Sequence, residues 1–202
     1  MATTHALFGA LLGGVLVPVA PELAPVAFAA GAAGGVAPDL DLYAGHRRTL
    51  HFPVYYGVAA ALALPVALLV PGPATVAAVV FLAAAALHSA MDALGGGLEL
   101  RPWEATSDDA VYSHFHGRWL AARRWVRYDG APEDAALAAA AALPVFAVYG
   151  DFTTPLVGGA VALSVGYAAV RRRLVDLGEW LVARAPDPVL ARVPERFVAD
   201  YA

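Results

Sequence analysis

Long apolar stretches separated by short polar tips dominate the pattern of this sequence. Phe52–Val70 and Ala74–Leu94 are each long enough to cross a bilayer as a single helix, because about 18 apolar residues suffice. His88 and Asp92, near the end of the second stretch, are its only clearly polar members. The Pro-Gly-Pro turn at 71–73 cannot continue a helix, so the two stretches are predicted to form a helical hairpin.

Two further apolar stretches, Ala6–Ala37 and Ala135–Val170, are each too long for one span and a little short for two. Prolines and Glu22 interrupt the first, and Asp151 with its neighbours interrupts the second. We interpret each as two short helices joined by a polar tip. The predicted fold is therefore an all-α polytopic membrane protein with about six short transmembrane segments in three hairpins. Four spans with re-entrant segments are the alternative.

The composition supports a membrane protein and excludes several other classes. Of the 202 residues, 60% are hydrophobic and 15% are charged, and the mean hydropathy is +0.62. Soluble domains contain about 45–50% apolar and about 25% charged residues. The absence of cysteine excludes disulfides and thiolate metal sites. A net charge of −4 gives no indication of nucleic-acid binding. The sequence leaves the oligomeric state open.

The basic residues predict the orientation in the membrane. All thirteen are arginines, and in the six-span interpretation they fall on the side that holds the N-terminus, 38–51, 95–134 and the tail from 171. Positive charge in short loops marks the cytoplasmic side. We therefore expect a multi-pass protein of the inner (cytoplasmic) membrane with both termini in the cytoplasm. No basic residue precedes Arg47, which disfavours a cleaved signal peptide at the start of the chain.

The six-span interpretation divides the chain into four parts: a membrane domain at 1–103, a cytoplasmic loop at 104–134, a membrane hairpin at 135–170 and an amphipathic tail at 171–202. Two cytoplasmic segments carry apolar residues at helical spacing and are expected to be interfacial helices, with packing against a core as the alternative. The first comprises Val111, Phe115, Trp119, Ala122 and Val126. The second comprises Leu174, Leu177, Trp180 and Leu181.

Histidines and aspartates gather at the cytoplasmic ends of the predicted helices. His88 and Asp92 are four residues apart, so a helix places both on one face. Imidazole and carboxylate ligands together suit zinc, manganese or iron better than calcium. We therefore predict a shared site for one or two divalent metal ions. Its candidate ligands are His5, Asp39, Asp41, His46, His51, His88 and Asp92.

Each candidate also has an explanation that needs no metal. A single histidine at a helix end is often a hydrogen-bonded interfacial residue, Asp39 could cap a helix, and His88 could simply pair with Asp92. Ionisable groups within membrane segments are costly and usually functional, which favours the shared site. His114 and His116 are left outside the predicted ligand set.

Four motifs occur in an order that resembles the YdjM-like inner-membrane proteins, which are described as metal-dependent hydrolases. They are Thr4-His5-Ala6 with Gly9, Pro38-Asp39-Leu40-Asp41, Gly45-His46-Arg47 through His51, and His88-Ser89-Ala90-Met91-Asp92 followed by a glycine run and Pro102-Trp103. The resemblance covers roughly residues 4–103. It implies a metal-dependent hydrolase. The style of the motifs is also similar, more distantly, to that of phosphoesterases with clustered metal ions.

The sequence departs from the family pattern at several positions. The family usually has glycine after the His-Arg pair and then Thr-His-Ser, whereas this chain has Arg48, Leu50 and Phe52 around His51. Leu42 stands where the family often has a histidine. These changes leave the predicted ligands in place but affect the residues around them.

The leading functional hypothesis is hydrolysis at a metal site on the cytoplasmic face, on a phosphoester, lipid-like or other small-molecule substrate within reach of the bilayer. A divalent ion there would polarise a phosphoryl or carbonyl oxygen and lower the pKa of bound water towards about 7. Arg47, Arg48 and Arg101 could pair with a phosphate, or could serve only as membrane-side anchors. A non-enzymatic scaffold with a structural metal, and an ion or proton transporter, are the alternatives.

Overall fold

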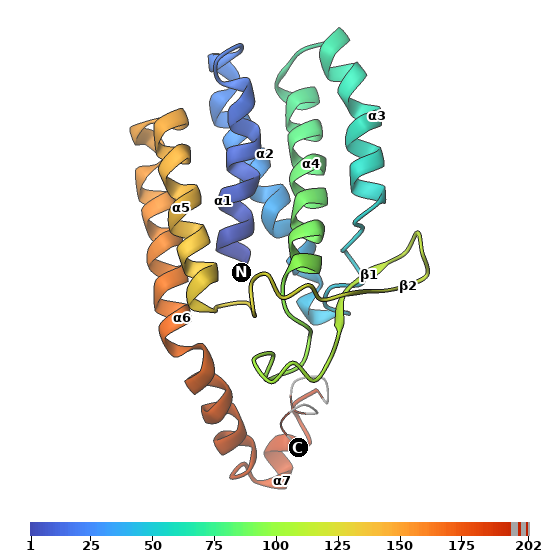
Figure 1. Cartoon of the computed structure of the whole chain (residues 1–202), viewed down its shortest axis with the longest axis vertical. Helices are drawn as coiled ribbons and strands as arrows, with labels where there is room; N and C mark the ends of the chain where they lie inside the picture. Colours follow the sequence, from blue (N-terminus) through green and yellow to red (C-terminus); the bar gives the residue numbers. More distant parts are fainter. Residues whose placement is uncertain (195–197, 199–200, 202) are drawn as a thin grey trace.

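The computed structural model describes residues 1–194, 198 and 201, and within them it is mostly helical. Six main helices stand side by side (Figure 1). They are α1 (Ala2–Gly13), α2 (Ala24–Val36), α3 (Tyr55–Leu69), α4 (Pro73–Leu94), α5 (Pro132–Tyr149) and α6 (Thr154–Val182). Shorter elements are the 3₁₀ helices η1 (Gly14–Leu16), η2 (Pro21–Leu23), η3 (Ala37–Tyr43) and η4 (Asp151–Thr153), the helix α7 (Asp187–Leu190) and the strands β1 (Asp109–Ser113) and β2 (Arg118–Ala121).

Within the part of the chain that the structure describes, four helical segments are long and apolar enough to cross a membrane. They are Pro21–Leu42, Pro73–Leu94, Pro132–Tyr149 and Asp151–Val182. Ala2–Leu16 and Tyr55–Leu69 are shorter apolar helices. A helix therefore occurs in each of the six predicted segments, and the prediction of a helical, membrane-compatible protein is confirmed. Whether the chain crosses six times or four stays a prediction.

The three predicted hairpin tips lie at one end of the bundle, opposite the N-terminus (Figure 1). Proline occupies the first turn of α4 and of α5, where its missing N–H costs no helical hydrogen bond. Gly150, between α5 and α6, has φ of +73°, a conformation that glycine adopts without a Cβ clash. Local sequence thus accounts for where these helices begin and where the chain reverses.

Helices α1 and α2 pack backbone against backbone. A Cβ at Gly9 would collide with the carbonyl oxygen of Gly31, and a Cβ at Gly31 with that of Gly9. A Cβ at Gly35 would likewise collide with the carbonyl oxygen of His5. Glycines four residues apart on each helix permit this approach, as in the small-residue interfaces of membrane helices. The contact brings the last turn of α2 directly beside His5.

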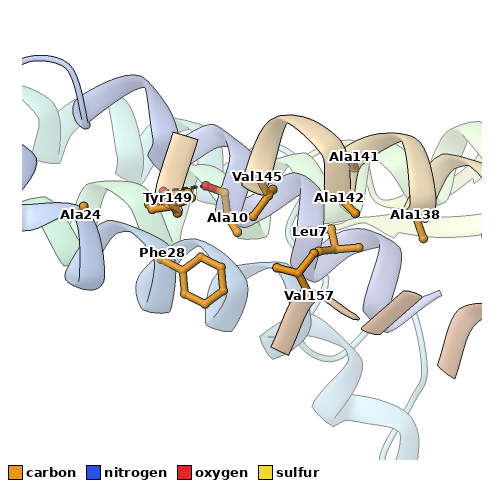
Figure 2. Packing of buried hydrophobic residues seen from close by; sticks show 10 residues of the cluster. All are labelled: Leu7, Ala10, Ala24, Phe28, Ala138, Ala141, Ala142, Val145, Tyr149 and Val157. Atoms are coloured by element: carbon orange, nitrogen blue, oxygen red, sulfur yellow. Dashed lines mark hydrogen bonds between the residues drawn. The ribbon is translucent and has the colours of Figure 1, made fainter. Parts of the chain in front are cut away.

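A second apolar cluster joins α1 and α2 to α5 and α6 (Figure 2). Leu7 and Phe28 meet Val145 and Val157 there, surrounded by buried alanines. The Tyr149 hydroxyl donates a hydrogen bond of 2.8 Å to the Ala10 carbonyl, so the buried phenol is satisfied. This cluster fixes the α5–α6 pair against the helix that carries His5.

The predicted interfacial helix at 111–126 is wrong, because β1 and β2 form an antiparallel hairpin there. Tyr112 pairs with Trp119 across the strands, and their rings lie 5.5 Å apart. Gly117 has φ of +63° in the connecting turn, which an α-helix cannot accommodate. β-branched and aromatic residues flanking a glycine turn favour strands, and this local preference outweighed the helical spacing of the apolar positions.

Apolar side chains cover much of the outer surface. No residue of α3 is buried, and Leu62 and Leu69 are 72% and 82% exposed. Such a surface is stable where lipid replaces water. The second predicted stripe, with Leu177 and Trp180, lies exposed on the continuous helix α6 rather than in a separate tail, so the expected boundary at 170/171 falls inside a helix. Positions 195–197, 199–200 and 202 of the predicted tail lie outside the described residues.

Candidate metal centre

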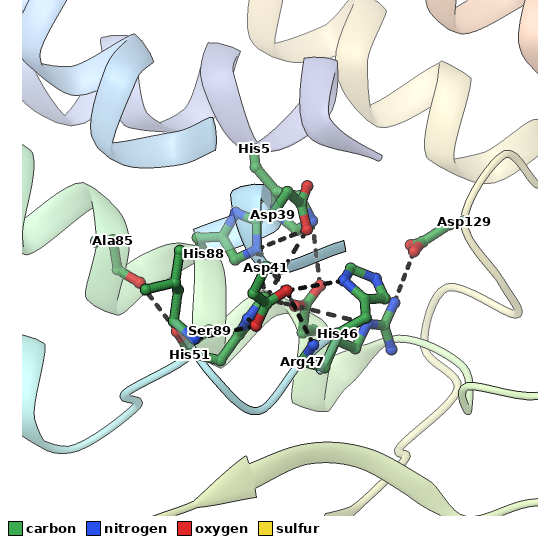
Figure 3. Close-up of polar contacts among 12 residues, drawn as sticks. His5, Asp39, Asp41, His46, Arg47, His51, Ala85, His88, Ser89 and Asp129 are labelled. Atoms are coloured by element: carbon green, nitrogen blue, oxygen red, sulfur yellow. Dashed lines mark hydrogen bonds and ion pairs between the residues drawn. The ribbon is translucent and has the colours of Figure 1, made fainter. Parts of the chain in front are cut away.

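The seven predicted ligands come from α1, η3, the loop after η3, and α4, and Figure 3 labels all of them except Asp92. His5 lies in the first turns of α1, and His88 and Asp92 lie on one face of α4. The 3₁₀ helix η3 carries Asp39 and Asp41. The loop that follows it carries His46 and His51.

Four of the seven converge on one point, namely Asp39, His51, His88 and Asp92. The Nε2 atoms of His51 and His88 are 3.1 Å apart. Asp92 Oδ2 lies 3.0 Å from His51 Nε2 and 3.3 Å from His88 Nε2. Asp39 Oδ1 is 3.4 Å from His88 Nε2 and 3.9 Å from His51 Nε2. A tetrahedral ion with bonds of about 2.0–2.1 Å spaces its ligand atoms about 3.4 Å apart, so the four atoms form a cage of suitable size.

Hydrogen bonds on the far side of each imidazole orient the two histidines. His88 Nδ1 donates to the Gly35 carbonyl at 2.7 Å, and His51 Nδ1 donates to Asp41 Oδ2 at 2.9 Å. Both acceptors lack a proton to give, so in a neutral ring each Nδ1 carries the hydrogen and each Nε2 presents its lone pair. Two nitrogen lone pairs and two carboxylate oxygens therefore face one another, an arrangement that a cation stabilises.

Asp92 supports this interpretation because its Oδ2 is buried and accepts no hydrogen bond. Its other oxygen lies 3.3 Å from His5 Nε2. A buried carboxylate oxygen without a donor is costly unless a cation compensates it. The Arg47 guanidinium lies 3.6 Å away and compensates part of this charge, and a metal ion between Asp92 and the two Nε2 atoms would compensate the rest.

Asp41 organises the loop that carries His46 and His51. Its carboxylate accepts hydrogen bonds from the backbone N–H groups of Arg47, Arg48 and Leu50 at 3.1–3.3 Å. It also lies 3.1 Å from His46 Nδ1 in addition to its bond to His51. All its acceptor positions are in use, and a carboxylate behind a ligating histidine both orients the ring and strengthens it as a ligand.

The other predicted ligands surround the cage without entering the group of four. The rings of His5 and His88 have centroids 4.1 Å apart. His46 has a 29% exposed side chain and binds Asp41. His114 and His116 lie apart from the cage on the β-hairpin, where they contact the Arg48 carbonyl and Ser113 respectively.

Arg47 is buried next to the cage. Its Nε lies 3.6 Å from Asp92 Oδ2, while its terminal nitrogens donate to Asp129 at 2.6 Å and to the Gly96 carbonyl at 2.8 Å. Burial disfavours its charge, but Asp92 and Asp129 outweigh that effect and raise the pKa of Arg47 above its ordinary value. Its backbone φ of +57° is unusual for an arginine, so the surrounding contacts hold it in place.

Asp129 links Arg47 to the N-terminal amino group. Partial burial by itself would raise the pKa of Asp129, whose side chain is 42% exposed, but the Met1 ammonium and Arg47 hold it well below its usual range. Burial likewise works against the Met1 ammonium, yet Asp129 and Asp134 raise the pKa of that group to about 10. Asp134 also accepts a 2.6 Å hydrogen bond from Thr4 Oγ1. Ion pairs thus tie the start of α1 to the segment that begins α5.

The two other predicted phosphate-binding arginines have partners elsewhere. Arg48 stacks its guanidinium on the Tyr112 ring at 4.7 Å. Arg101 pairs with Glu179 at 2.6 Å and with Asp176 at 3.2 Å, on the C-terminal half of α6.

A cavity of about 340 Å³ adjoins the cage on the side of Asp39. Its wall is formed by Met1, Ala2, Thr3, Asp39, Leu42, His46, Asp129, Leu163 and Tyr167. The Asp39 side chain is 25% exposed, whereas those of His51, His88 and Asp92 are at most 2% exposed. Asp39 is therefore the ligand at which the cage meets the cavity.

The sequence analysis did not predict three groups that contribute to the site. The Gly35 carbonyl is a backbone group, so no side-chain pattern in the sequence could indicate it. Asp129 precedes a glycine, a pattern that is typical of an ordinary turn. Asp134 lies in the first turn of α5, where an acidic residue is common for helix stability alone.

Comparisons with protein-family models, with curated proteins and with solved structures give no match to this chain.

Proposed function

We propose that this protein is a metal-dependent hydrolase of the membrane. Asp39, His51, His88 and Asp92 hold one divalent ion, and a substrate reaches it through the cavity beside Asp39. The observation that carries the proposal is the convergence of four acceptor atoms, two of them imidazole nitrogens whose hydrogens are committed elsewhere. Zinc, manganese and iron all suit such a ligand set.

The hydrolytic part of the proposal is supported by the asymmetry of burial around the cage. Three ligands are sealed inside the protein and the fourth borders a cavity, so water reaches an ion held there beside Asp39, as a ligand additional to the four. A catalytic ion needs such an open position, and it supplies a Lewis acid and a more acidic water. The motifs shared with the YdjM-like proteins point to the same class of reaction.

Burial also favours a second candidate, a structural metal in a membrane scaffold. His51, His88 and Asp92 are almost fully enclosed, and a closed tetrahedral shell is typical of structural ions. Under this alternative the ion ties η3, the loop with His51 and α4 together and has no water ligand. In either case we propose that the site lies at the cytoplasmic face of an inner membrane, an orientation supported by the arginines on that side of the six-span interpretation.

Elemental analysis of detergent-purified protein tests the site directly. We expect about one equivalent of zinc, manganese or iron in the wild type, and its loss in Asp39→Ala and His88→Ala. His116→Ala is the matched control, because this histidine lies outside the cage. Removing the ion with a chelator should lower the midpoint of thermal unfolding in the wild type but not in His88→Ala, since a ligand that binds only the folded state stabilises it.

Absence of metal from the wild type, both as purified and after titration with zinc and manganese, would contradict the proposal. A metal-loaded protein that hydrolyses neither acyl esters nor phosphoesters would favour the structural alternative. Metal-dependent hydrolysis that disappears in His88→Ala and survives in His116→Ala would support the enzyme.

A further inference from the structure

The cavity beside Asp39 has one polar and one apolar wall. Asp39, His46 and Asp129 form the polar side. Leu42 and Leu163 belong to the apolar side, and they are 56% and 62% exposed on the outer surface of the bundle. Leu163 lies within the candidate span Asp151–Val182, so its exposed face is expected to meet lipid rather than water. The cavity therefore joins the candidate metal centre to the lipid-facing surface.

The charges around the cavity disfavour an anionic substrate. Among the described residues that line it, none is an arginine. Arg47 donates to Asp129 and to backbone carbonyls, Arg48 stacks on Tyr112, and Arg101 pairs with α6. A phosphate entering the cavity would meet the carboxylates of Asp39 and Asp129, and the cation among the described lining residues, the Met1 ammonium, is already paired with Asp129 and Asp134.

Counting the ion does not reverse this conclusion. Among the described residues, the charged groups joined by ion pairs at the centre are five carboxylates, the Arg47 guanidinium and the Met1 ammonium, which sum to minus three with neutral histidines, while Arg171 lies behind the Tyr167 wall of the cavity. A divalent ion brings the sum to minus one. The carboxylates are those of Asp39, Asp41, Asp92, Asp129 and Asp134. A phosphate dianion thus gains little from the site as a whole.

We infer that the substrate is an uncharged acyl ester of an amphiphile, with the ester carbonyl at the metal centre and the hydrocarbon chain along Leu42 and Leu163. This inference rests on the proposed hydrolase function and specifies its substrate class. The reaction consumes one water: the acyl carbon gains a bond to the water oxygen and loses its bond to the alcohol oxygen. The alcohol leaves with a proton from that water, and the products are a carboxylic acid and an alcohol.

The cavity volume agrees with a partly inserted substrate. About 340 Å³ is at the lower end of small-ligand pockets, so it holds an ester group and a short length of chain. The remainder of the chain would lie on the exposed leucines, in the acyl region of the bilayer. Burial of each additional methylene contributes about 0.8 kcal/mol, or roughly fourfold in affinity, so chain length should matter.

Hydrolysis by the metal-loaded protein in lipid nanodiscs provides the test, with p-nitrophenyl octanoate, p-nitrophenyl acetate and bis(p-nitrophenyl) phosphate as probes. We expect kcat/KM to be at least about tenfold higher for the octanoate than for the acetate. Leu163→Ser should reduce that preference several-fold. Leu174→Ser is the matched control, because Leu174 is exposed on the same helix away from the cavity and leaves partitioning into the lipid unchanged.

A binding measurement examines the charge argument without turnover. Octanohydroxamic acid is uncharged in solution and gives up its proton to the site or to buffer when it binds the ion, whereas octylphosphonate arrives as an anion, and both carry eight carbons. We expect Asp129→Asn to strengthen octylphosphonate binding by about tenfold, because one carboxylate is lost and Arg47 is released, and to change hydroxamate binding little. Isothermal titration calorimetry with the zinc-loaded protein measures both.

The outcomes separate this inference from the proposed function. Preferential hydrolysis of the phosphodiester, or equal rates for octanoate and acetate, would overturn the inference while leaving a metal-dependent hydrolase. Unchanged octylphosphonate affinity in Asp129→Asn would also overturn it. Metal binding without hydrolysis of any probe and without hydroxamate binding would overturn both.

Discussion

At the scale of single residues, the site depends on which atom of each side chain faces the centre. His51 and His88 both direct Nε2 inward because Asp41 and the Gly35 carbonyl bind their Nδ1 atoms. Among the members of the cage, Asp41 is hydrogen-bonded to His51. Its charge therefore acts on the ion through the imidazole, as a second carboxylate behind a metal ligand does.

Replacing Asp41 by asparagine tests this indirect role. We expect Asp41→Asn to weaken zinc binding by about 10–100-fold, because the loss of charge behind His51 makes the ring a poorer ligand. Competition with a chelator of known affinity measures the dissociation constant. Asp108→Asn is the control, since Asp108 is not a member of the cage and pairs with Arg124. Unchanged affinity would argue against the indirect role, and complete loss of metal would make Asp41 a direct ligand, as the sequence analysis proposed.

At the scale of elements, close packing of α1 on α2 determines how well the centre is assembled. Gly9 and Gly31 bring the two backbones into contact, and Gly35 continues that contact to His5. Because the Gly35 carbonyl then binds His88, the helix interface and the orientation of a ligand are coupled. The β-hairpin contributes too, since the Tyr112 N–H donates to the Arg47 carbonyl at 2.9 Å.

A single methyl group in this interface should therefore affect both stability and metal binding. We expect Gly9→Ala to lower the free energy of unfolding by about 1–3 kcal/mol, because the added Cβ meets the rigid backbone of Gly31. Gly57→Ala serves as the control, since no atom lies within 4 Å of a Cβ at that position. It should be neutral or stabilising by up to about 1 kcal/mol. Thermal unfolding followed by circular dichroism in detergent compares the two. Equal midpoints would show that the interface has room to relax.

At the scale of the whole molecule, ion pairs connect the start of α1 and the loop after η3 to the segment that begins α5. Asp129 precedes α5 and binds Arg47, which lies between η3 and α3 and approaches Asp92 on α4. The apolar cluster around Leu7 and Val145 joins α1 and α2 to α5 and α6 within the bundle. Loss of the Asp129 charge should therefore lower the free energy of unfolding of the whole protein.

The pH dependence of unfolding tests this connection. The pKa of Asp129 is lower in the folded protein than its unfolded value of 3.8, so its stabilising effect is complete above about pH 4 and is lost as the pH falls further. Because the side chain is 42% exposed, we expect an effect of at most about 1 kcal/mol. Asp129→Asn should be less stable at pH 6 and lose less stability between pH 5 and pH 3 than the wild type. The exposed Asp187→Asn control should follow the wild type. Parallel curves for all three proteins would exclude a role for Asp129.

Much of the helical architecture follows from the sequence alone. Apolar stretches of sufficient length, with proline and glycine between them, predict the six helices because these signals are local in the chain. The hairpin at 109–121 was missed because apolar spacing in a short segment agrees with a helix as well as with strands. The composition likewise indicates a membrane-compatible surface, since it depends only on which residues are present.

The metal centre is determined differently. The sequence by itself supplied the ionisable residues and their expected gathering at one end of the helices, including all four members of the cage. Only the tertiary structure decided that Asp39, His51, His88 and Asp92 converge while Asp41 stands behind His51 and His46 faces a cavity. It also decided that Arg47 pairs with Asp129 and Asp92, whereas Arg48 and Arg101 have partners away from the cage. Distances between atoms far apart in the chain depend on how the helices pack, and no local pattern encodes them.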